Sequence, residues 1–408
     1  MTAAPTDLET WRLALAVGLL MVSAFCTHLL LLPGPNRAVR LPLGLFFLSN
    51  TLRLTALPVE HLLLAAPMPL LGLSLDLAEV PLSMVQPFLL WLYVRRLTAD
   101  PTRADAPIRR WWHLAPVIFG CLVYGAVLAQ QAASLSLGEG SRAAALLPAT
   151  VGLLWGATGV FYALVPFYAV LTIRRLLSYR TQLKALYAST EGRELRWIWC
   201  LTAVVAVFWS VNLFAILLEG AGVAVGALTP EVSFYAEATA QMALLWTIAI
   251  WGVRQRPGMV PPRPRREEES EPAPDGRKYG HSGLDERHLA RIAAKIEAVM
   301  RADTLYRDPD LSLWDLAEKV GAKRHYVSQA LNDHLGQNFF DYVNGFRIED
   351  AKGQLVGTSA PILTITFDVG FNSRSVFYRA FKQNVGMTPS QFRHRGQLVA
   401  GEGLQTLS

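Results

Sequence analysis

The sequence has little charge for its length. Asp, Glu, Lys and Arg make up 17% of the 408 residues, and hydrophobic residues make up 52%. Soluble domains average about 25% charged residues. The shortage is concentrated in residues 1–253, whereas residues 254–408 have an ordinary charge content. This division excludes a single compact soluble domain and a disordered chain, and it predicts an apolar first part followed by a soluble second part.

Cysteine is also scarce, with Cys26, Cys121 and Cys200 as the only examples. Each lies inside an apolar run, so we expect small buried hydrophobic side chains rather than a disulfide framework or a metal site. The membrane part has neither HExxH nor GxSxG, the patterns of zinc proteases and serine hydrolases. We therefore expect a protein that is not an enzyme and that holds no metal and no cofactor.

Seven apolar stretches precede residue 254. Each has about 20 residues or more, which is enough for a helix to cross a hydrocarbon core of about 30 Å. They are residues 11–32, 41–64, 69–94, 112–133, 146–173, 197–218 and 234–253. Because a bilayer offers no water to backbone polar groups, each stretch is predicted to be a helix. Residues 1–253 are therefore predicted to form a seven-helix transmembrane bundle that acts as a sensor domain.

Basic residues indicate how this bundle is oriented. They concentrate in alternate loops, which is typical of loops on the cytoplasmic side. Examples are Arg95 and Arg96, then Arg174, Arg175 and Arg180, then Arg254. The pattern predicts a multi-pass protein of the cytoplasmic (inner) membrane, with the N-terminus outside and everything after residue 253 in the cytoplasm.

Four polar side chains are predicted near the middle of the second and third spans. At 1.5 Å per residue, Arg53 lies about 16 Å and Glu79 about 15 Å below the outer ends of their helices. Asn50 and Asp76 are three residues away on the same helix faces. Burying such groups in lipid is costly. They form either a ligand pocket that opens outward or a structural pair that fixes helix packing, and the sequence leaves both interpretations open.

Proline, glycine and charged residues dominate residues 254–282, so we expect a disordered tether there. Residues 283–395 have amphipathic helical patterns and no strand signal, and residues 396–408 are expected to be a flexible tail. The predicted fold class is therefore all-α, with a transmembrane bundle, a flexible linker and a cytoplasmic helical domain.

The cytoplasmic domain contains a first pair of short helices joined by a turn. A helix is predicted over about 284–301, and then LSLWDLAEKVG (311–321) places Ser312 at an N-cap with Asp315 completing a capping box. Gly321 allows the turn before a helix over about 324–334. This arrangement is a helix-turn-helix, whose second helix can enter a DNA major groove.

A longer helix over about 338–356 leads to a second such pair. Ile362, Ile365 and Val369 form an apolar face, Gly370 makes a turn, and Ser373 caps the next helix. Thr388-Pro389 then begins a last short helix, because proline suits the first helical position.

Two helix-turn-helix units joined by one helix resemble the DNA-binding domain of the AraC family of bacterial transcription regulators. The resemblance covers about 110 residues, and DVGFNSRSVFYRAFKQNVGMTPSQFR (368–393) is its most specific part. With the seven spans ahead of it, the whole chain is similar to the membrane-embedded branch of that family. The resemblance implies a regulator that binds double-stranded promoter DNA.

Both second helices present polar side chains that the resemblance places against DNA. In the first unit these are Lys323, Arg324, His325, Ser328 and Gln329, and in the second they are Arg374, Ser375, Tyr378, Arg379 and Lys382. Arg379 suits bidentate bonding to guanine, and Gln329 suits adenine. Residues 283–395 carry a net charge of only about +2, so affinity is expected to depend on these local faces and on helix N-termini rather than on bulk charge.

The sequence thus favours a membrane-bound transcription regulator that couples an unknown small-molecule or membrane signal to promoter binding. A homodimer and RNA polymerase are further expected partners, beside the bilayer and DNA. Because a disordered tether transmits torque poorly, we expect coupling through dimerisation rather than through a rigid lever. The alternative is a membrane transporter or channel with a cytoplasmic regulatory module, which the double helix-turn-helix disfavours.

Overall fold

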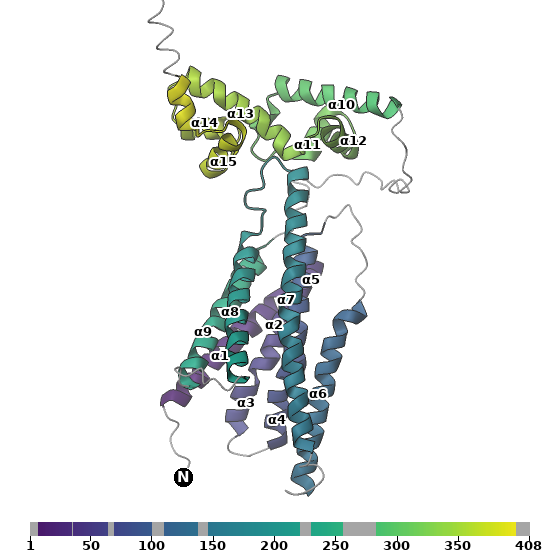
Figure 1. Cartoon of the computed structure of the whole chain (residues 1–408), viewed down its shortest axis with the longest axis vertical. Helices are drawn as coiled ribbons and strands as arrows, with labels where there is room; N and C mark the ends of the chain where they lie inside the picture. The colour runs from purple at the N-terminus through teal and green to yellow at the C-terminus, as the bar shows by residue number, and fades with distance from the viewer. Residues whose placement is uncertain are drawn as a thin grey trace, which may run out of the picture. The chain divides into compact units, whose positions relative to one another are not determined.

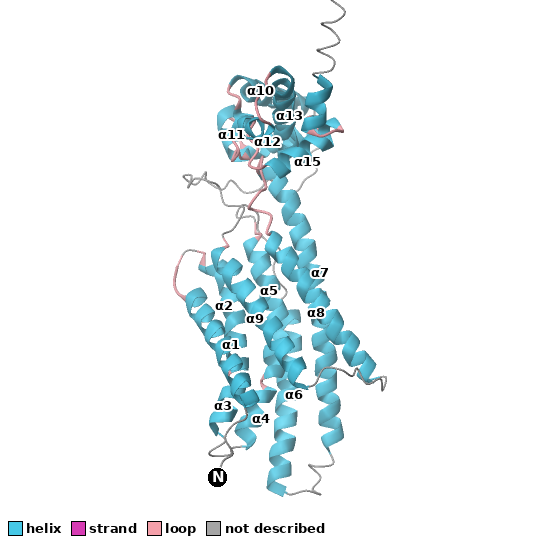
Figure 2. Ribbon diagram, turned by 90° about the vertical axis from the view of Figure 1, so that its left-hand side faces the viewer, coloured by secondary structure: helices cyan, strands magenta, loops and turns pink. Residues whose placement is uncertain are grey.

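The computed structural model describes residues 7–34, 36–63, 69–99, 110–137, 146–220, 230–255 and 283–396. The elements in these ranges are helices, and no strand occurs among them (Figure 2), which confirms the all-α prediction. Residues 256–282 of the expected linker, and the expected tail beyond residue 396, lie outside the described residues.

The chain divides into two compact units. Unit 1 comprises Met1–Leu176 and Leu195–Gly258, and unit 2 comprises Leu177–Glu194 and Met259–Ser408. The apolar part of the sequence therefore contributes residues 177–194 to the unit that contains the helix-turn-helix pairs, an assignment that sequence patterns did not suggest.

Unit 1 is built from apolar helices (Figure 1). They are α1 (Asp7–Leu31), α2 (Arg37–Leu54), α3 (Ala56–Leu63), α4 (Pro69–Leu77), α5 (Glu79–Leu97), α6 (Arg110–Leu137), α7 (Leu147–Leu186), α8 (Arg196–Gly220) and α9 (Pro230–Arg254). The last part of α7, residues 177–186, belongs to unit 2. Within unit 1, α1 packs on α2 and α9, and α5 packs on α2 and α6.

Two of the seven expected spans are broken in the middle. The second divides at Thr55 into α2 and α3, and the third divides at Ala78 into α4 and α5. Each break lies three residues before a proline, Pro58 or Pro81. Proline lacks an N–H and its ring crowds the carbonyl four residues earlier, so a helix that stops and restarts with proline in its first turn avoids both costs.

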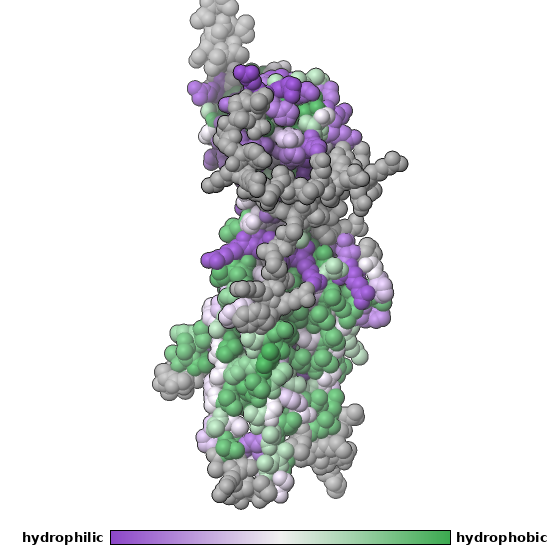
Figure 3. All heavy atoms as spheres, turned by 90° about the vertical axis from the view of Figure 1, so that its right-hand side faces the viewer, coloured by the Kyte–Doolittle hydropathy of each residue, from purple (hydrophilic) through white to green (hydrophobic). Residues whose placement is uncertain are grey.

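Five helices in the described part of the chain are long and apolar enough to cross a membrane. They are Thr10–Leu31, Leu73–Leu97 (counted across the break at Ala78), Trp112–Ser136, Leu147–Leu186 and Arg196–Leu218. A shorter apolar helix covers Ala238–Gly252. The second expected span, which α2 and α3 form, is outside both sets, so seven crossings stay a prediction. Hydrophobic side chains dominate the visible face of unit 1 in Figure 3.

The cysteines differ from expectation in their surroundings. Cys26 is buried, but Cys121 and Cys200 are exposed, and all three are free thiols. The prediction of burial was wrong for these two because an apolar run does not identify the inner face of a helix. In α6 and α8, apolar side chains also cover the outer face, as the exposed Leu122 and Val204 show.

Unit 2 consists of two helical groups on either side of a central helix (Figure 1). Its elements are α10 (Gly283–Ala302), η2 (Leu305–Arg307), α11 (Leu313–Val320), α12 (Arg324–Gln329), the π-helical turn η3 (Ala330–His334), α13 (Phe339–Gly357), α14 (Ile362–Asp368), α15 (Arg374–Val385) and a last helix over residues 389–396. Helices α10, α11 and α12 lie on one side of α13, and α14 and α15 lie on the other.

Caps and turns of unit 2 follow the sequence prediction. The Ser312 hydroxyl accepts from the Asp315 N–H, and the Asp315 carboxylate accepts from the Ser312 N–H, which completes the capping box. Gly321 ends α11 in the left-handed region with φ 69°. Ser373 caps α15 by accepting from the Val376 N–H. The first recognition helix differs from the predicted helix over 324–334 in one respect. Only Arg324–Gln329 is α-helical, and Ala330–His334 forms the π-helical turn η3.

Glycine is required at position 370, in the turn between α14 and α15, for two reasons. Its φ is +94°, a conformation that side chains disfavour. A Cβ at this position would also lie 2.6 Å from the Tyr306 carbonyl oxygen and 2.7 Å from that of Arg307. The turn between α14 and α15 therefore packs directly on the backbone that leads from α10 into the first helix-turn-helix.

Candidate nucleic-acid interface and cavity

The polar face of α12 is largely open to solvent. Lys323, His325 and Gln329 are exposed, whereas Arg324 and Ser328 are half-buried. The backbone that places them is fixed from inside, because Val327, Ala330 and Leu331 are fully buried beneath the helix.

Arg324 has a packing role as well as a charge. Its guanidinium carbon lies 5.0 Å from the centre of the Trp314 ring on α11, a distance at which a cation and an aromatic ring attract. The contact ties the first turn of α12 to the helix before it. Burial and the positive charges of Lys323 and Arg324 lower the pKa of His325 below its ordinary value, so this imidazole is neutral near pH 7 and has one N–H to donate.

The outer face of α15 is a second exposed basic surface. Arg374, Ser375, Arg379 and Lys382 are exposed, and Tyr378 is half-buried. Arg374 Nη2 donates to the Tyr378 hydroxyl at 3.2 Å, and its guanidinium lies 4.9 Å from that ring.

Tyr378 is held from both sides. Its hydroxyl also lies 3.4 Å from Ser390 Oγ in the last helix. Burial raises the pKa of Tyr378, but the hydrogen bonds from Ser390 and Arg374 and the charges of Arg374 and Arg393 outweigh it, and the net effect is a lowered pKa. The Arg374–Tyr378 pair is thus ordered, while Arg379 and Lys382 project from the same face.

The sequence-selected residues therefore form two exposed polar faces, one on each side of α13. Arginine and glutamine there can bond base edges in a major groove, and lysine can contact phosphates. Their DNA contacts stay predictions.

Arg347 is a central residue that sequence analysis missed. It is 1% exposed, in the middle of α13. Its Nε donates to the Tyr306 carbonyl at 2.6 Å, its Nη2 to the Asp308 carbonyl at 2.8 Å, and its Nη1 to Asn344 Oδ1 and the Ala188 carbonyl, each at 3.3 Å. Burial lowers its pKa to about 10, partly offset by Asp308, so it stays charged at neutral pH. The sequence signal was its spacing, because Arg347 lies four residues after Val343 and four residues before Ala351, on the buried face of α13.

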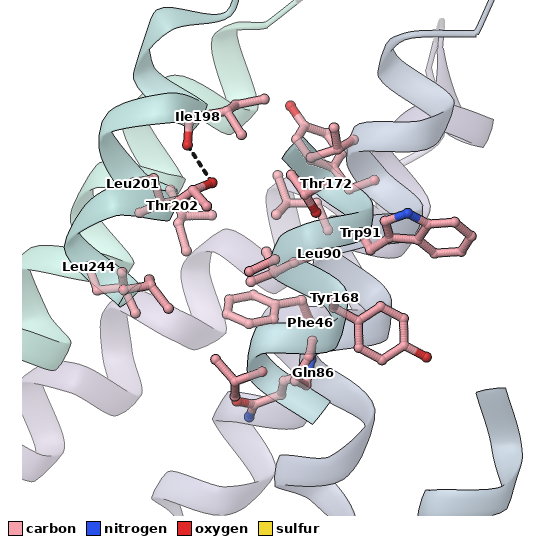
Figure 4. A pocket seen from close by; sticks show the side chains of 18 of the residues that line it. Phe46, Gln86, Leu90, Trp91, Tyr168, Thr172, Ile198, Leu201, Thr202 and Leu244 are labelled. Carbon is pink, nitrogen blue, oxygen red and sulfur yellow. Dashed lines mark hydrogen bonds between the residues drawn. The ribbon is translucent and has the colours of Figure 1, made fainter. Parts of the chain in front are cut away.

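Unit 1 contains a mainly apolar cavity of about 250 Å³ (Figure 4). Residues of α2, α5, α7, α8 and α9 line it, and Phe46, Leu90, Leu201 and Leu244 are among them. Its polar lining includes Gln86, Thr172, Thr202 and Gln241. Gln86 Nε2 is buried without a hydrogen-bond partner among the described residues, whereas Thr202 donates to the Ile198 carbonyl at 2.8 Å.

The four polar residues predicted near the middle of the second and third spans are partly brought together. Arg53 Nη1 lies 2.9 Å from Glu79 Oε1, with the Glu79 side chain 58% exposed. Asn50 is buried and donates to the Phe46 carbonyl, and Asp76 is exposed. Asn50 and Arg53 line the cavity, but Asp76 and Glu79 do not. The ligand pocket and the structural pair both stay predictions.

Comparison with known proteins gives matches to unit 2. A family model described as "Helix-turn-helix domain" matches residues 316–395. An uncharacterized HTH-type transcriptional regulator of Staphylococcus aureus strain COL is 36% identical over 99 residues, which are 24% of this chain and 13% of the relative. The chain thus spans about an eighth of the length of that relative. The Escherichia coli K12 protein named "Regulatory protein SoxS" is 32% identical over 88 residues, 22% of this chain and 82% of that protein.

Two solved structures are similar to the same region. One is a protein of unknown function from Listeria innocua, with 26% identity and a TM-score of 0.22, covering 24% of this chain and 90% of that one. The other is the C-terminal domain of AraT, a response regulator from Geobacillus stearothermophilus, with 27% identity and a TM-score of 0.22, covering 28% and 86%.

Proposed function

Because the chain belongs, through its C-terminal domain, to the AraC family of helix-turn-helix transcription regulators, we propose that it is a membrane-embedded member that reads promoter DNA and senses its signal in unit 1. The observation that carries the proposal is that one chain combines two features. Unit 2 has two exposed polar faces on its recognition helices, and five apolar helices long enough to span a membrane lie in unit 1, apart from the end of α7.

The polar faces of α12 and α15 support base reading by both helix-turn-helix units. Each recognition helix has its apolar side buried within unit 2. Gln329 at the end of α12 is exposed, and so are Arg379 and Lys382 of α15. In dimeric helix-turn-helix proteins the two recognition helices contact half-sites about one DNA turn, or about 34 Å, apart, and we expect the same spacing for the two helices of this chain.

Charge at helix ends supports the membrane arrangement. Arg40 Nη2 donates to the Leu29 carbonyl at 2.7 Å near the end of α1, and Arg175 Nη2 donates to the Thr98 carbonyl at 3.0 Å after α5. Cations at helix C-termini bond the last carbonyls and suit the helix dipole. Both arginines lie on the side predicted to be cytoplasmic, and Arg175 is one of the residues that indicate the orientation.

The DNA-reading part is tested by selecting bound sequences from a random library with the full chain in nanodiscs. We expect a recovered site with two half-sites about one helical turn apart. As a matched pair, Gln329→Ala and Arg379→Ala should relax preference in different half-sites. Recovery of no consensus sequence by the wild-type protein would contradict promoter recognition and would favour a transporter or channel with a regulatory module.

The membrane part is tested with topology reporters. Alkaline phosphatase, active only outside the cytoplasm, and β-galactosidase, active only inside, are fused after residue 253 and after residue 137. We expect β-galactosidase activity at the first site and phosphatase activity at the second. Phosphatase activity at residue 253 would place unit 2 away from DNA and sink the proposal.

The cavity of unit 1 is the sensing site that we propose, with an apolar molecule bearing one hydrogen-bond acceptor as its ligand. The apolar lining favours such a molecule, and the unpartnered Gln86 Nε2 can donate to the acceptor. A reporter driven by the selected site is tested against a panel of apolar ketones and alcohols. Gln86→Leu should abolish a response that Gln130→Leu, outside the cavity, preserves. A response that survives Gln86→Leu would place sensing elsewhere.

A further inference from the structure

The connection between α7 and α8, residues 187–195, is a second covalent route between the apolar helices and the DNA-binding domain. Its residues up to Glu194, with the end of α7, belong to unit 2. Tyr187 and Ala188 are each only 1% exposed. A loop that merely joined two helices would run over the surface, so this burial needs a reason.

The connection pairs with the first helix-turn-helix unit. Tyr187 forms an antiparallel bridge with Ser312, the N-cap of α11. The Ala188 N–H donates to the Leu311 carbonyl at 3.0 Å, and the Tyr187 ring lies 5.8 Å from that of Trp314. Trp314 in turn stacks on Arg324 at the start of α12, so the contact reaches the base of the first recognition helix.

The connection and the end of α7 also contact α13 and the second helix-turn-helix. The Ala188 carbonyl accepts from Arg347 of α13 at 3.3 Å, and Lys184 Nζ lies 5.1 Å from the Phe340 ring at the start of α13. Asn372 Nδ2 donates to Ser189 Oγ at 3.0 Å. Asn372 directly precedes Ser373, the N-cap of α15.

Two observations indicate that the connection braces the domain rather than blocks it. It supplies one of the carbonyls that satisfy the buried Arg347 charge, and an unsatisfied buried charge is costly. It also leaves the recognition residues Gln329 and Arg379 exposed. The contacts therefore fix the positions of the two helix-turn-helix units about α13. They leave uncovered the polar faces that we propose to contact DNA.

We propose that the α7–α8 connection is an intramolecular control element, docked between the two helix-turn-helix units, that relays the state of the membrane half to their relative orientation. The inference rests on the proposed function. Two recognition helices must match two grooves at once, so a shift of the connection changes affinity without altering any base-contacting residue. This route is direct, in contrast to the expectation from sequence that coupling depends on dimerisation across a disordered tether.

The test uses the full chain in nanodiscs and its selected DNA site. Ala188→Pro removes the N–H that donates to the Leu311 carbonyl. We expect DNA affinity to fall about tenfold, which is the size of change expected from the loss of one hydrogen bond. Glu191→Pro is the matched control. It lies one position after Thr190 in a turn closed by the Arg193 N–H, with Gly192 at φ 74°, where proline is favoured, so affinity should be unchanged.

A second pair of variants guards against misfolding of the first. In a protein with Cys26, Cys121 and Cys200 replaced by alanine, Ser189→Cys and Asn372→Cys are bridged with a short bis-maleimide, whose two double bonds each add one cysteine thiol. We expect rapid bridging, retained DNA affinity and loss of the reporter response to the signal. Failure to bridge, unchanged or increased affinity in Ala188→Pro, or a full signal response after bridging would each overturn the inference. Failure of the wild type to bind DNA would instead overturn the proposed function.

Discussion

Helices α8 and α10 use hydrophobic side chains in opposite ways. The outer face of α8 exposes Val204, Val207 and Val211, each more than 60% accessible. In α10 the residues at similar spacing, Ile292 and Ile296, are buried. The arrangement of α8 suits the membrane position that we propose for unit 1, and that of α10 suits water, because apolar surface is favoured in lipid and disfavoured in water.

Polar side chains differ between the units in the same sense. In unit 1, hydroxyl groups often bond the carbonyl four residues earlier in their own helix, as Thr27 does with Ser23 and Thr202 does with Ile198. In unit 2, comparable groups such as Ser312 and Ser373 cap helix ends. A polar group surrounded by apolar side chains bonds the nearest backbone acceptor, whereas one at a helix end satisfies free N–H groups and sets where the helix begins.

The largest expected effect concerns the buried arginine of unit 2. Arg347→Met removes the guanidinium donors to the Tyr306, Asp308 and Ala188 carbonyls, and we expect unit 2 to lose about 3–5 kcal/mol, as when one partner of a buried charged network is removed. Hydrogen exchange of α13 amides in the full chain measures the loss. Arg379→Met, an exposed arginine of the same unit, should change it by less than about 0.5 kcal/mol. Equal losses of stability in Arg347→Met and Arg379→Met would show that the burial of Arg347 does not contribute to the stability of unit 2.

Next is the turn that joins α14 to α15. Gly370→Ala combines a positive φ with a Cβ 2.6 Å from a backbone oxygen, and a loss of about 3 kcal/mol is expected. Gly386→Ala has a similar φ of +82° but open space around the new Cβ, so only about 1 kcal/mol of strain should remain. Denaturant unfolding followed by proteolysis of unit 2 compares them. Similar losses would mean that the close approach to residues 306–307 costs nothing.

A smaller effect is expected on DNA binding from the two faces. Arg379→Ala should weaken binding to the preferred site by about 1–3 kcal/mol and relax base preference at one position. Lys382→Ala should weaken binding to all sequences alike and reduce the salt dependence by about one phosphate contact. Titrations at several salt concentrations separate the two. If Arg379→Ala left the preferred sequence unchanged, its role as a base reader would be wrong.

The smallest effect on stability is expected in unit 1. The Arg53–Glu79 pair is half open, since the Glu79 side chain is 58% exposed, and such pairs contribute about 0–1 kcal/mol. Arg53→Gln and Glu79→Gln should therefore leave expression level and detergent stability unchanged. Because only Arg53 lines the cavity, we expect Arg53→Gln to reduce the reporter response more than Glu79→Gln does. Unfolding of both variants would favour the structural interpretation of the pair.

Much of unit 2 could be predicted from the sequence. Ser312 with Asp315, Gly321, Ser373 and Thr388 mark helix ends through contacts within four residues. In unit 1 the apolar runs predicted helices but not their breaks at Thr55 and Ala78, because Pro87, Pro116 and Pro166 lie within continuous helices. A proline permits a break, and packing decides whether one forms.

Local interactions thus made the helices, their caps and the outward position of the candidate recognition residues readable in the sequence, since the partners are one turn apart. The tertiary structure alone decided that Ala188 meets Arg347, 159 residues away, and that Ser189 meets Asn372, 183 residues away. It also decided which polar atoms face the cavity of unit 1. These contacts depend on how whole helices pack, and the side chains that make them carry no periodicity or spacing from which their partners could be deduced.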